Sequence, residues 1–242
     1  MPEDISALLT VSIYVEAMLG LLLLHTWVQK LEIRAVACWG GAHLLRAGSI
    51  ALFGMFGHLP DVITVDVANV ILLTSFAVTW AGARLFSGRK IHLIGILAGS
   101  VIWLIASRTP AISESVALGA LLSSAIIATY VWLAAAELWC INEDQLISRL
   151  PAFFMLFAQG ALFLMRTPLG VLMPHPAGTE PLFGSVWLTV LSSQALLFTI
   201  AVAFILMAMA KERAARMQEN GKLVPPPADT HDRHGLISRI MS

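Results

Sequence analysis

Seven long apolar stretches dominate the sequence and limit what the chain can fold into. A helix needs about 20 apolar residues to cross the hydrocarbon core of a bilayer, which is about 30 Å thick. The stretches cover approximately residues 6–28, 36–57, 62–86, 91–107, 116–137, 150–173 and 185–210. They are too continuously apolar for the alternating pattern of a membrane β-barrel. We therefore expect an all-α polytopic membrane protein whose seven-transmembrane helix bundle comprises residues 1–210.

The composition excludes several other classes of protein. Hydrophobic residues make up 58% of the chain and charged residues 12%, against about 45–50% and about 25% in soluble domains. The formal net charge of zero argues against a nucleic-acid partner and leaves the lipid bilayer as the expected one. Two cysteines and no paired histidine motif predict no metal, haem or other cofactor. No lysine lies inside a stretch, which excludes a retinal Schiff base.

The distribution of basic residues predicts the orientation in the membrane. Arg108 is the single basic residue expected on one side. The other side receives twelve: Lys30, Arg34, Arg84, Arg89, Lys90, Arg149, Lys211, Arg213, Arg216, Lys222, Arg233 and Arg239. Because cytoplasmic loops are enriched in Lys and Arg, we expect an outside N-terminus and a cytoplasmic C-terminus in the bacterial inner membrane. The acidic MPED start predicts a retained first helix rather than a cleaved signal peptide.

A few polar residues interrupt the apolar stretches and form the candidate site. They are Glu16, His43, Arg46, Asp66, Asn69 and Arg166. An ionisable residue inside a span costs roughly 2.5–3.5 kcal/mol on insertion scales, so it normally faces the bundle and has a partner. Estimated depth predicts that Glu16 pairs with Arg46 near the midplane, and Asp66 with Arg166 in the outer third. Two interpretations remain open: an outward-opening polar pocket for a small ligand or proton, and structural ion pairs that fix helix register.

Glycines inside the stretches predict close helix packing, since they let two backbones approach. These glycines are Gly20, Gly40, Gly41, Gly48, Gly82, Gly160 and Gly170.

The last segment, residues 211–242, has a different character. It opens with KERAARMQENGK, which we expect to continue the seventh helix and to carry a signal out of the bundle through Lys211, Glu212 and Arg213. Three consecutive prolines follow at 225–227, and the remainder has too few apolar residues for a core. We therefore expect a cytoplasmic exit helix followed by a disordered tail.

Three motifs together resemble a known family. They are ANVILLTSFAVTWAGARLFSGRK at 68–90, YVWLAAAELW at 130–139 leading to FLMRTPL at 163–169, and SSQALLFTIAVAFILMAMAKERAARM at 192–217. In their order and spacing they resemble the seven-span N-terminal sensor region of alphaproteobacterial membrane diguanylate cyclases, over residues 5–217. In that family the last helix leads through a charged helix to a GGDEF domain, which condenses two GTP into cyclic di-GMP.

The resemblance implies a function in signal transduction without chemistry of its own. No Gly-Gly-Asp-Glu-Phe loop occurs in the sequence, so we expect no cyclase domain and no enzymatic activity in this chain. It would be a sensor separated from its output, a free-standing relative, or the product of a frameshifted gene. The implied partners are a small ligand and a second copy of the chain. A solute transporter using the intramembrane charges is the main alternative, followed by a membrane enzyme or a structural protein.

Overall fold

A computed structural model gives the fold of the chain and describes residues 3–29, 33–60, 62–141, 147–172 and 186–223. These residues form helices, turns and one isolated bridge, with no strand among them. The helices are α1 (Glu3–Gln29), α2 (Arg34–Gly54), a π-helical turn η1 (Val62–Val67), α3 (Ala68–Phe86), α4 (Leu93–Ala106), α5 (Pro110–Ser113), α6 (Val116–Trp139), α7 (Arg149–Leu172) and α8 (Val186–Leu223). The predicted all-α class is confirmed.

Five of the seven expected spans have the length and hydropathy that a membrane-crossing helix needs, within the part of the chain that the structure describes. They are Ala7–Gln29, Arg34–Gly54, Val62–Phe86, Val116–Trp139 and Ser193–Glu219. The other two are α4, which is apolar but only 14 residues long, and α7, which carries Arg149 and Arg166. The five helices indicate a membrane protein.

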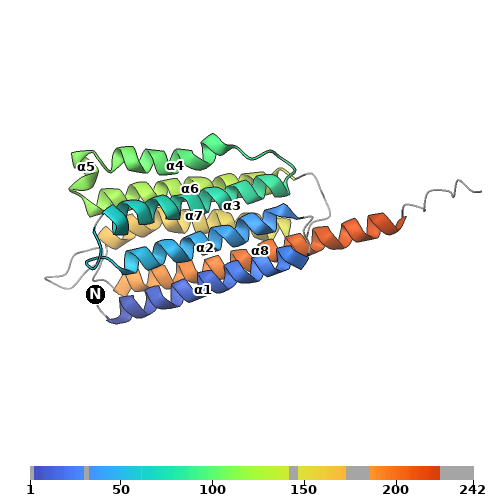
Figure 1. The fold of residues 1–242 in the computed structure, drawn as a ribbon, viewed down its shortest axis with the longest axis horizontal. Coiled ribbons are helices and arrows are strands. Elements are labelled where there is room, and N and C mark those ends of the chain that lie inside the picture. Colours follow the sequence, from blue (N-terminus) through green and yellow to red (C-terminus); the bar gives the residue numbers. More distant parts are fainter. Residues whose placement is uncertain (1–2, 30–32, 61, 142–146, 173–185, 224–242) are drawn as a thin grey trace, which may run out of the picture.

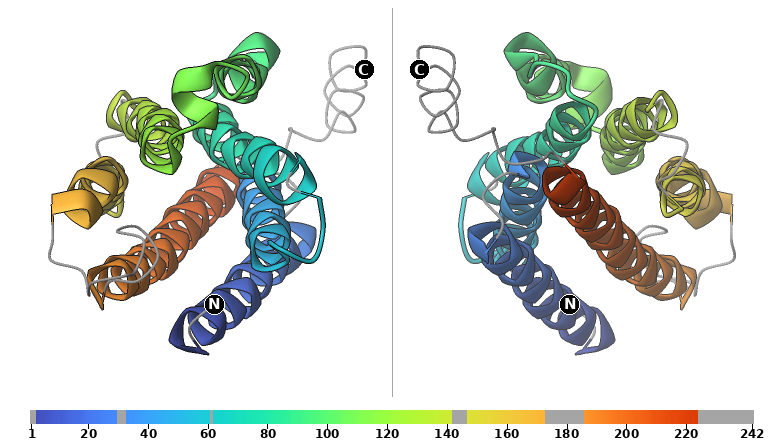
Figure 2. Two further views of the ribbon diagram at one scale, coloured as in Figure 1. Left: turned by 90° about the vertical axis from the view of Figure 1, so that its left-hand side faces the viewer. Right: turned by 90° about the vertical axis from the view of Figure 1, so that its right-hand side faces the viewer.

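The long helices lie side by side along one direction (Figure 1). Seen from the end, α1, α2, α3, α6, α7 and α8 follow one another around a ring, and α8 packs back against α1 (Figure 2). Helix α4 lies outside this ring against α3 and α6. The ring therefore brings the first and last helices together around a common interior.

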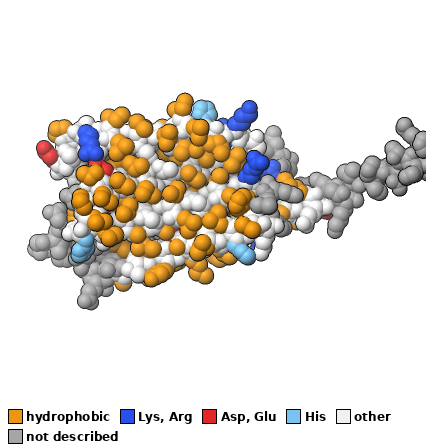
Figure 3. Space-filling model, viewed as in Figure 1, with side chains coloured by type: hydrophobic (Ala, Val, Ile, Leu, Met, Phe, Trp, Pro, Cys, Tyr) orange, Lys and Arg blue, Asp and Glu red, His pale blue; other side chains and the backbone are white. Residues whose placement is uncertain are grey.

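The outer surface is apolar between the two ends of the bundle. Hydrophobic side chains cover the face shown in Figure 3, and the Lys and Arg side chains lie near its ends. Ile94 on α4 is 80% exposed and Met18 on α1 is 73% exposed. Large continuous apolar surfaces are unusual on soluble monomers, so this surface indicates contact with lipid.

Two glycines bring the backbones of α1 and α2 together. A Cβ on Gly20 would lie 2.8 Å from the Leu44 side chain and 3.0 Å from the Gly40 carbonyl oxygen. A Cβ on Gly40 would lie 2.8 Å from Leu24 Cγ and 3.0 Å from the Gly20 carbonyl oxygen. Neither position has room for a side chain, which confirms the predicted close packing at these two glycines.

Tryptophan rings from neighbouring helices pack against two further glycines. A Cβ on Gly82 would lie 2.5 Å from Trp39 Nε1, and a Cβ on Gly160 would lie 2.4 Å from Trp132 Nε1. The prediction of close packing is therefore confirmed here too. It is wrong for two glycines that face open space, Gly41 and Gly48. The surroundings of Gly170 lie outside what the structure describes.

Candidate functional site

The centre of the bundle holds a buried carboxylate–imidazole pair. Glu16 on α1 and His43 on α2 are only 4% and 3% exposed, and 2.6 Å separates Glu16 Oε2 from His43 Nδ1. When the carboxylate is ionised it can only accept, so the Nδ1–H group then donates to it in a short, charge-assisted hydrogen bond. Gly20 lies one turn after Glu16 and Gly40 one turn before His43. The close approach of the two backbones thus makes this contact possible.

Arg46 brings a cationic group to the same carboxylate. It lies three residues after His43 on the same face of α2, is 6% exposed, and places its Nε 3.6 Å from Glu16 Oε2. Its guanidinium carbon lies 4.7 Å from the centroid of the Phe76 ring on α3, a cation–π contact. The Nε atom has no hydrogen-bond partner among the described residues. The pairing of Glu16 with Arg46 is confirmed, and we call Glu16, His43 and Arg46 the polar centre.

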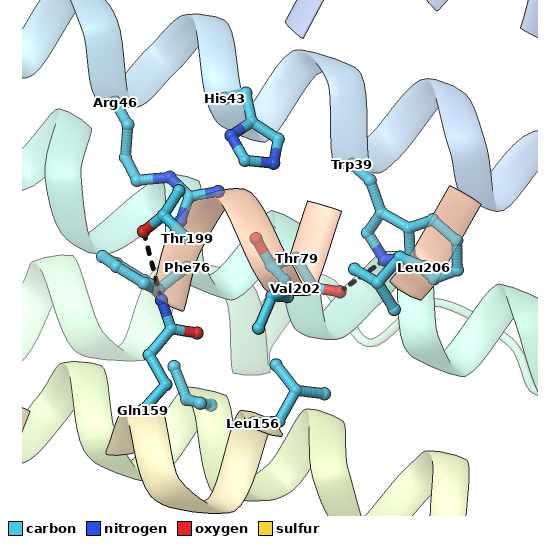
Figure 4. A pocket seen from close by; sticks show the side chains of 11 residues that line it. Trp39, His43, Arg46, Phe76, Thr79, Leu156, Gln159, Thr199, Val202 and Leu206 are labelled. Carbon is cyan, nitrogen blue, oxygen red and sulfur yellow. Dashed lines mark hydrogen bonds between the residues drawn. The ribbon is translucent and has the colours of Figure 1, made fainter. Parts of the chain in front are cut away.

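A narrow cavity adjoins the polar centre, with walls from α2, α3, α6, α7 and α8. Figure 4 shows Arg46 and His43 reaching into it from α2, with Gln159 on the opposite side. Gln159 is 2% exposed, and its Nε2 donates to Thr199 Oγ1 on α8 over 3.3 Å. The space that the centre of a water molecule can reach is about 10 Å³, which is room for roughly one water.

The predicted ion pair between Asp66 and Arg166 is wrong. Asp66 Oδ2 accepts from Arg108 Nη2 over 2.7 Å, at the end of the bundle rather than in the site. Helix α4 packs directly against α3, so the basic residue that follows α4 reaches Asp66. Arg166 is half-buried on α7, two turns beyond Gln159, and pairs with no carboxylate of the described residues. The Asn69 amide donates to the Val65 carbonyl one turn earlier.

The structure therefore divides the six candidate residues into two groups. Glu16, His43 and Arg46 come together in the interior. The remaining three, Asp66, Asn69 and Arg166, are not part of that cluster.

The exit segment, residues 211–213 of α8, is bound to the end of α3 and to the residue that precedes α7. Lys211 is exposed, whereas Glu212 accepts from the hydroxyl and the backbone N–H of Ser148, just before α7, over 2.5 and 3.4 Å. Arg213 donates to the carbonyl of Phe86, the last residue of α3. Its guanidinium carbon also lies 4.6 Å from the centroid of the Phe86 ring. Any displacement of α8 along its axis must change these contacts.

A second buried carboxylate lies at the same end of the bundle. Glu137 on α6 is 6% exposed and binds Arg84 Nη1 at 2.8 Å and Arg89 Nη1 at 3.1 Å. Ser87 Oγ also donates to the Glu137 carbonyl over 3.0 Å. The sequence analysis missed this residue because it is the last position of an apolar stretch. Its partners Arg84, at the end of α3, and Arg89, in the loop that follows, belong to the basic residues expected at the same end of the bundle, and this shared depth was the signal that could have found it.

One helix joins the polar centre to the exit segment. Thr199, Val202 and Leu206 of α8 line the cavity, and Arg213 follows Thr199 by 14 residues, which is about 21 Å along a helix. The helix then continues to Leu223 and extends beyond the other helices (Figure 1). The expected continuation of the last apolar stretch into a charged helix is confirmed.

The arrangement can hold a proton, one water molecule or a very small polar ligand. Glu16 and Arg46 balance each other, and one added proton on the imidazole or carboxylate changes the net charge of the buried cluster by one. No group of three or more His, Cys, Asp or Glu that could bind a metal occurs among the residues the structure describes.

Comparisons with protein-family models, curated proteins and solved structures find no match to this chain.

Proposed function

We propose that the protein is a sensory module of the bacterial inner membrane, in which a change at the polar centre moves α8 and is passed to the cytoplasm. The observation that carries this proposal is the continuity of α8, which lines the central cavity at Thr199 and bears the exit segment at 211–213. It agrees with the resemblance of the three sequence motifs to the sensor regions of membrane diguanylate cyclases.

We further propose seven membrane spans with the N-terminus outside and the C-terminus in the cytoplasm. The two additional spans are α4 and α7. The highly exposed apolar side chains of α4 support its contact with lipid. The basic residues at the start of α2, the end of α3 and the exit segment of α8 support a cytoplasmic location for that end, by the positive-inside rule.

The signal in this proposal is a change of charge or hydrogen bonding at the polar centre. Binding of a proton or a small polar ligand changes the attraction between Glu16, His43 and Arg46, and therefore the packing of α1 against α2. The Gln159–Thr199 hydrogen bond connects the cavity to α8. A ligand shifts such an equilibrium only if it binds one of two states more tightly. In a homodimer, a shift of α8 would change how two attached output domains meet.

The test joins a diguanylate cyclase domain to the C-terminus of the full chain and measures cyclic di-GMP in cells. Glu16→Gln removes the central negative charge but keeps the shape, and should change the output about fivefold or more. Glu114→Gln, at an exposed acidic position, should leave it unchanged. Equal output from the two variants, at equal insertion into the membrane, would contradict the proposal.

A second variant tests the route through α8. A helix-breaking proline is best placed at Ala215, because Ala214 is buried and Ala215 is exposed. Ala215→Pro therefore interrupts the helix without removing a packed side chain. It should abolish the difference in output between the wild type and Glu16→Gln. An undiminished difference would exclude α8 as the route.

A transporter is the second candidate, because three ionisable side chains meet in the bundle interior. The cavity has room for roughly one water, which favours a proton over a larger solute in this conformation. Uptake of protons or of a solute into sealed vesicles containing the purified protein, abolished by Glu16→Gln, would support transport and replace the sensory proposal.

A further inference from the structure

A second cavity lies at the exit end of the bundle, separate from the polar centre. It has a volume of about 260 Å³ and lies between the beginning of α2, the end of α3 and the exit segment of α8. None of its lining residues belongs to the polar centre or its cavity. Its volume is also far larger than that of the central cavity, so it can hold the polar group of a much larger ligand.

Two arginines from different helices line this cavity. Arg34 is the first residue of α2, and Arg213 belongs to the exit segment of α8. The planar guanidinium group matches the oxygens of a phosphate with paired N–H donors. The bond from Arg213 to the Phe86 carbonyl and its stacking on the Phe86 ring fix the orientation of that guanidinium.

The remaining walls are apolar. They come from Ile33, Leu85, Phe86 and Met217, of which Ile33 and Phe86 are buried. Ile33 directly precedes the first turn of α2 and provides no side-chain cap. A free inorganic anion would gain nothing from the apolar walls, whereas the glycerol and acyl parts of a phospholipid would.

We propose that this cavity binds the phosphate group of an anionic phospholipid from the cytoplasmic leaflet. Arg34 and Arg213 hold the headgroup, and the apolar walls contact the upper part of the acyl chains. Basic pockets between helices on the cytoplasmic side are suited to such headgroups. The proposal rests on the membrane orientation proposed above but does not require that the protein be a sensor. A bound lipid would tie α8 to α2.

The test measures lipid binding to the purified full-length protein by native mass spectrometry. The protein in detergent is titrated with phosphatidylglycerol or phosphatidylcholine of the same acyl chains. We expect preferential binding of phosphatidylglycerol, and roughly tenfold weaker binding for Arg34→Gln and for Arg213→Gln, since each removes charge-assisted hydrogen bonds. Arg216→Gln is the matched control, because Arg216 lies one turn further along α8 and does not line the cavity.

The outcomes separate the sources of the anion and the causes of weakened binding. Equal binding of the two lipids, or an equal loss in the Arg216→Gln control, would overturn the proposal. Competition by millimolar inorganic phosphate as effective as by lipid would assign the cavity to a soluble anion instead. Arg34 is exposed, so Arg34→Gln should not disturb the packing of the bundle. If Arg213→Gln weakens lipid binding and Arg34→Gln does not, the weakening reflects the lost contact between Arg213 and Phe86. That result would also overturn the proposal.

Discussion

At the scale of single residues, the Glu16 carboxylate accepts from His43 and faces Arg46, so one anionic group serves two neighbours. All three side chains are buried, so bulk water cannot replace a partner that is removed. Loss of one member of a buried charge pair typically costs about 3–5 kcal/mol, because it leaves the other charge uncompensated. This cost gives a way to separate a structural from a functional role for the cluster.

We expect Glu16→Gln to lower the free energy of unfolding by roughly 3 kcal/mol. The double variant Glu16→Gln with Arg46→Met should recover most of this loss, because it removes the uncompensated guanidinium as well. The measurement is a denaturant titration of the purified protein in micelles, with Glu114→Gln as the control. Losses that simply add in the double variant would show that the two charges do not interact. Recovered stability without recovered signalling would favour a ligand site over a structural pair.

At the scale of helices, the contact between α1 and α2 determines whether the polar centre can form. The Gly20 and Gly40 backbones approach so closely that an added Cβ would lie 3.0 Å from the opposing carbonyl oxygen. Gly48 on the same helix α2 has nothing within 4 Å of its added Cβ. Gly20, inside the interface, and Gly48, outside it, therefore form a matched pair of positions for substitution by alanine.

Gly20→Ala should destabilise the protein by about 1–3 kcal/mol, because overpacking forces the helices apart. Gly48→Ala should be neutral or stabilising by up to about 1 kcal/mol, because alanine favours the helix. Thermal unfolding of the two purified variants in the same detergent checks both signs. A Gly20→Ala protein as stable as the wild type would mean that α1 and α2 do not pack as described.

The positions of the helices along the chain could be predicted from the sequence more fully than which helices pack against each other. Depth along the apolar stretches placed Glu16 and Arg46 at the same level, and their helices are adjacent in sequence and in space. Depth also suggested a pair between Asp66 and Arg166, but the partner of Asp66 is Arg108. Which helices pack side by side depends on the shapes of whole surfaces, and the level of a residue in the membrane does not contain that information.

The same limit applies to individual positions on a helix. Composition marked glycines as packing sites but did not tell which of them face a neighbour, so Gly82 was predicted correctly and Gly48 was not. Glu137 escaped notice because an acidic residue at the end of an apolar stretch usually reaches solvent. Here two arginines of the adjoining α3 and its following loop cover it.

At the scale of the whole molecule, the proposed orientation can be tested with the protein's own cysteines. Cys140 is exposed directly after α6, at the end of the bundle where α8 leaves it, and Cys38 is partly buried in α2. In a Cys38→Ser background, a membrane-impermeant maleimide should label Cys140 in inside-out vesicles and not in intact spheroplasts.

The matched control places a cysteine at the opposite end. Ser113→Cys, in a chain without Cys38 and Cys140, should react in spheroplasts, because Ser113 is exposed in α5. Labelling of Cys140 in intact spheroplasts would show that the orientation is the reverse of the one proposed. It would also contradict the cytoplasmic location on which the proposed roles of the exit segment and the lipid site depend.

In the proposed topology, the shortness of α4 would make the protein sensitive to the thickness of the bilayer. Its 14 residues extend about 21 Å, against a hydrocarbon core of about 30 Å. If α4 crosses the membrane as proposed, the lipid beside it would thin, at a cost of fractions of a kcal/mol per Å of mismatch. Because α4 lies outside the ring, this strain acts on one side of the molecule, through the loop that leads back to Phe86 and its bond with Arg213. In the proposed topology, a thicker membrane would therefore strain the hydrogen bond between the Phe86 carbonyl and Arg213, which holds the exit segment against α3.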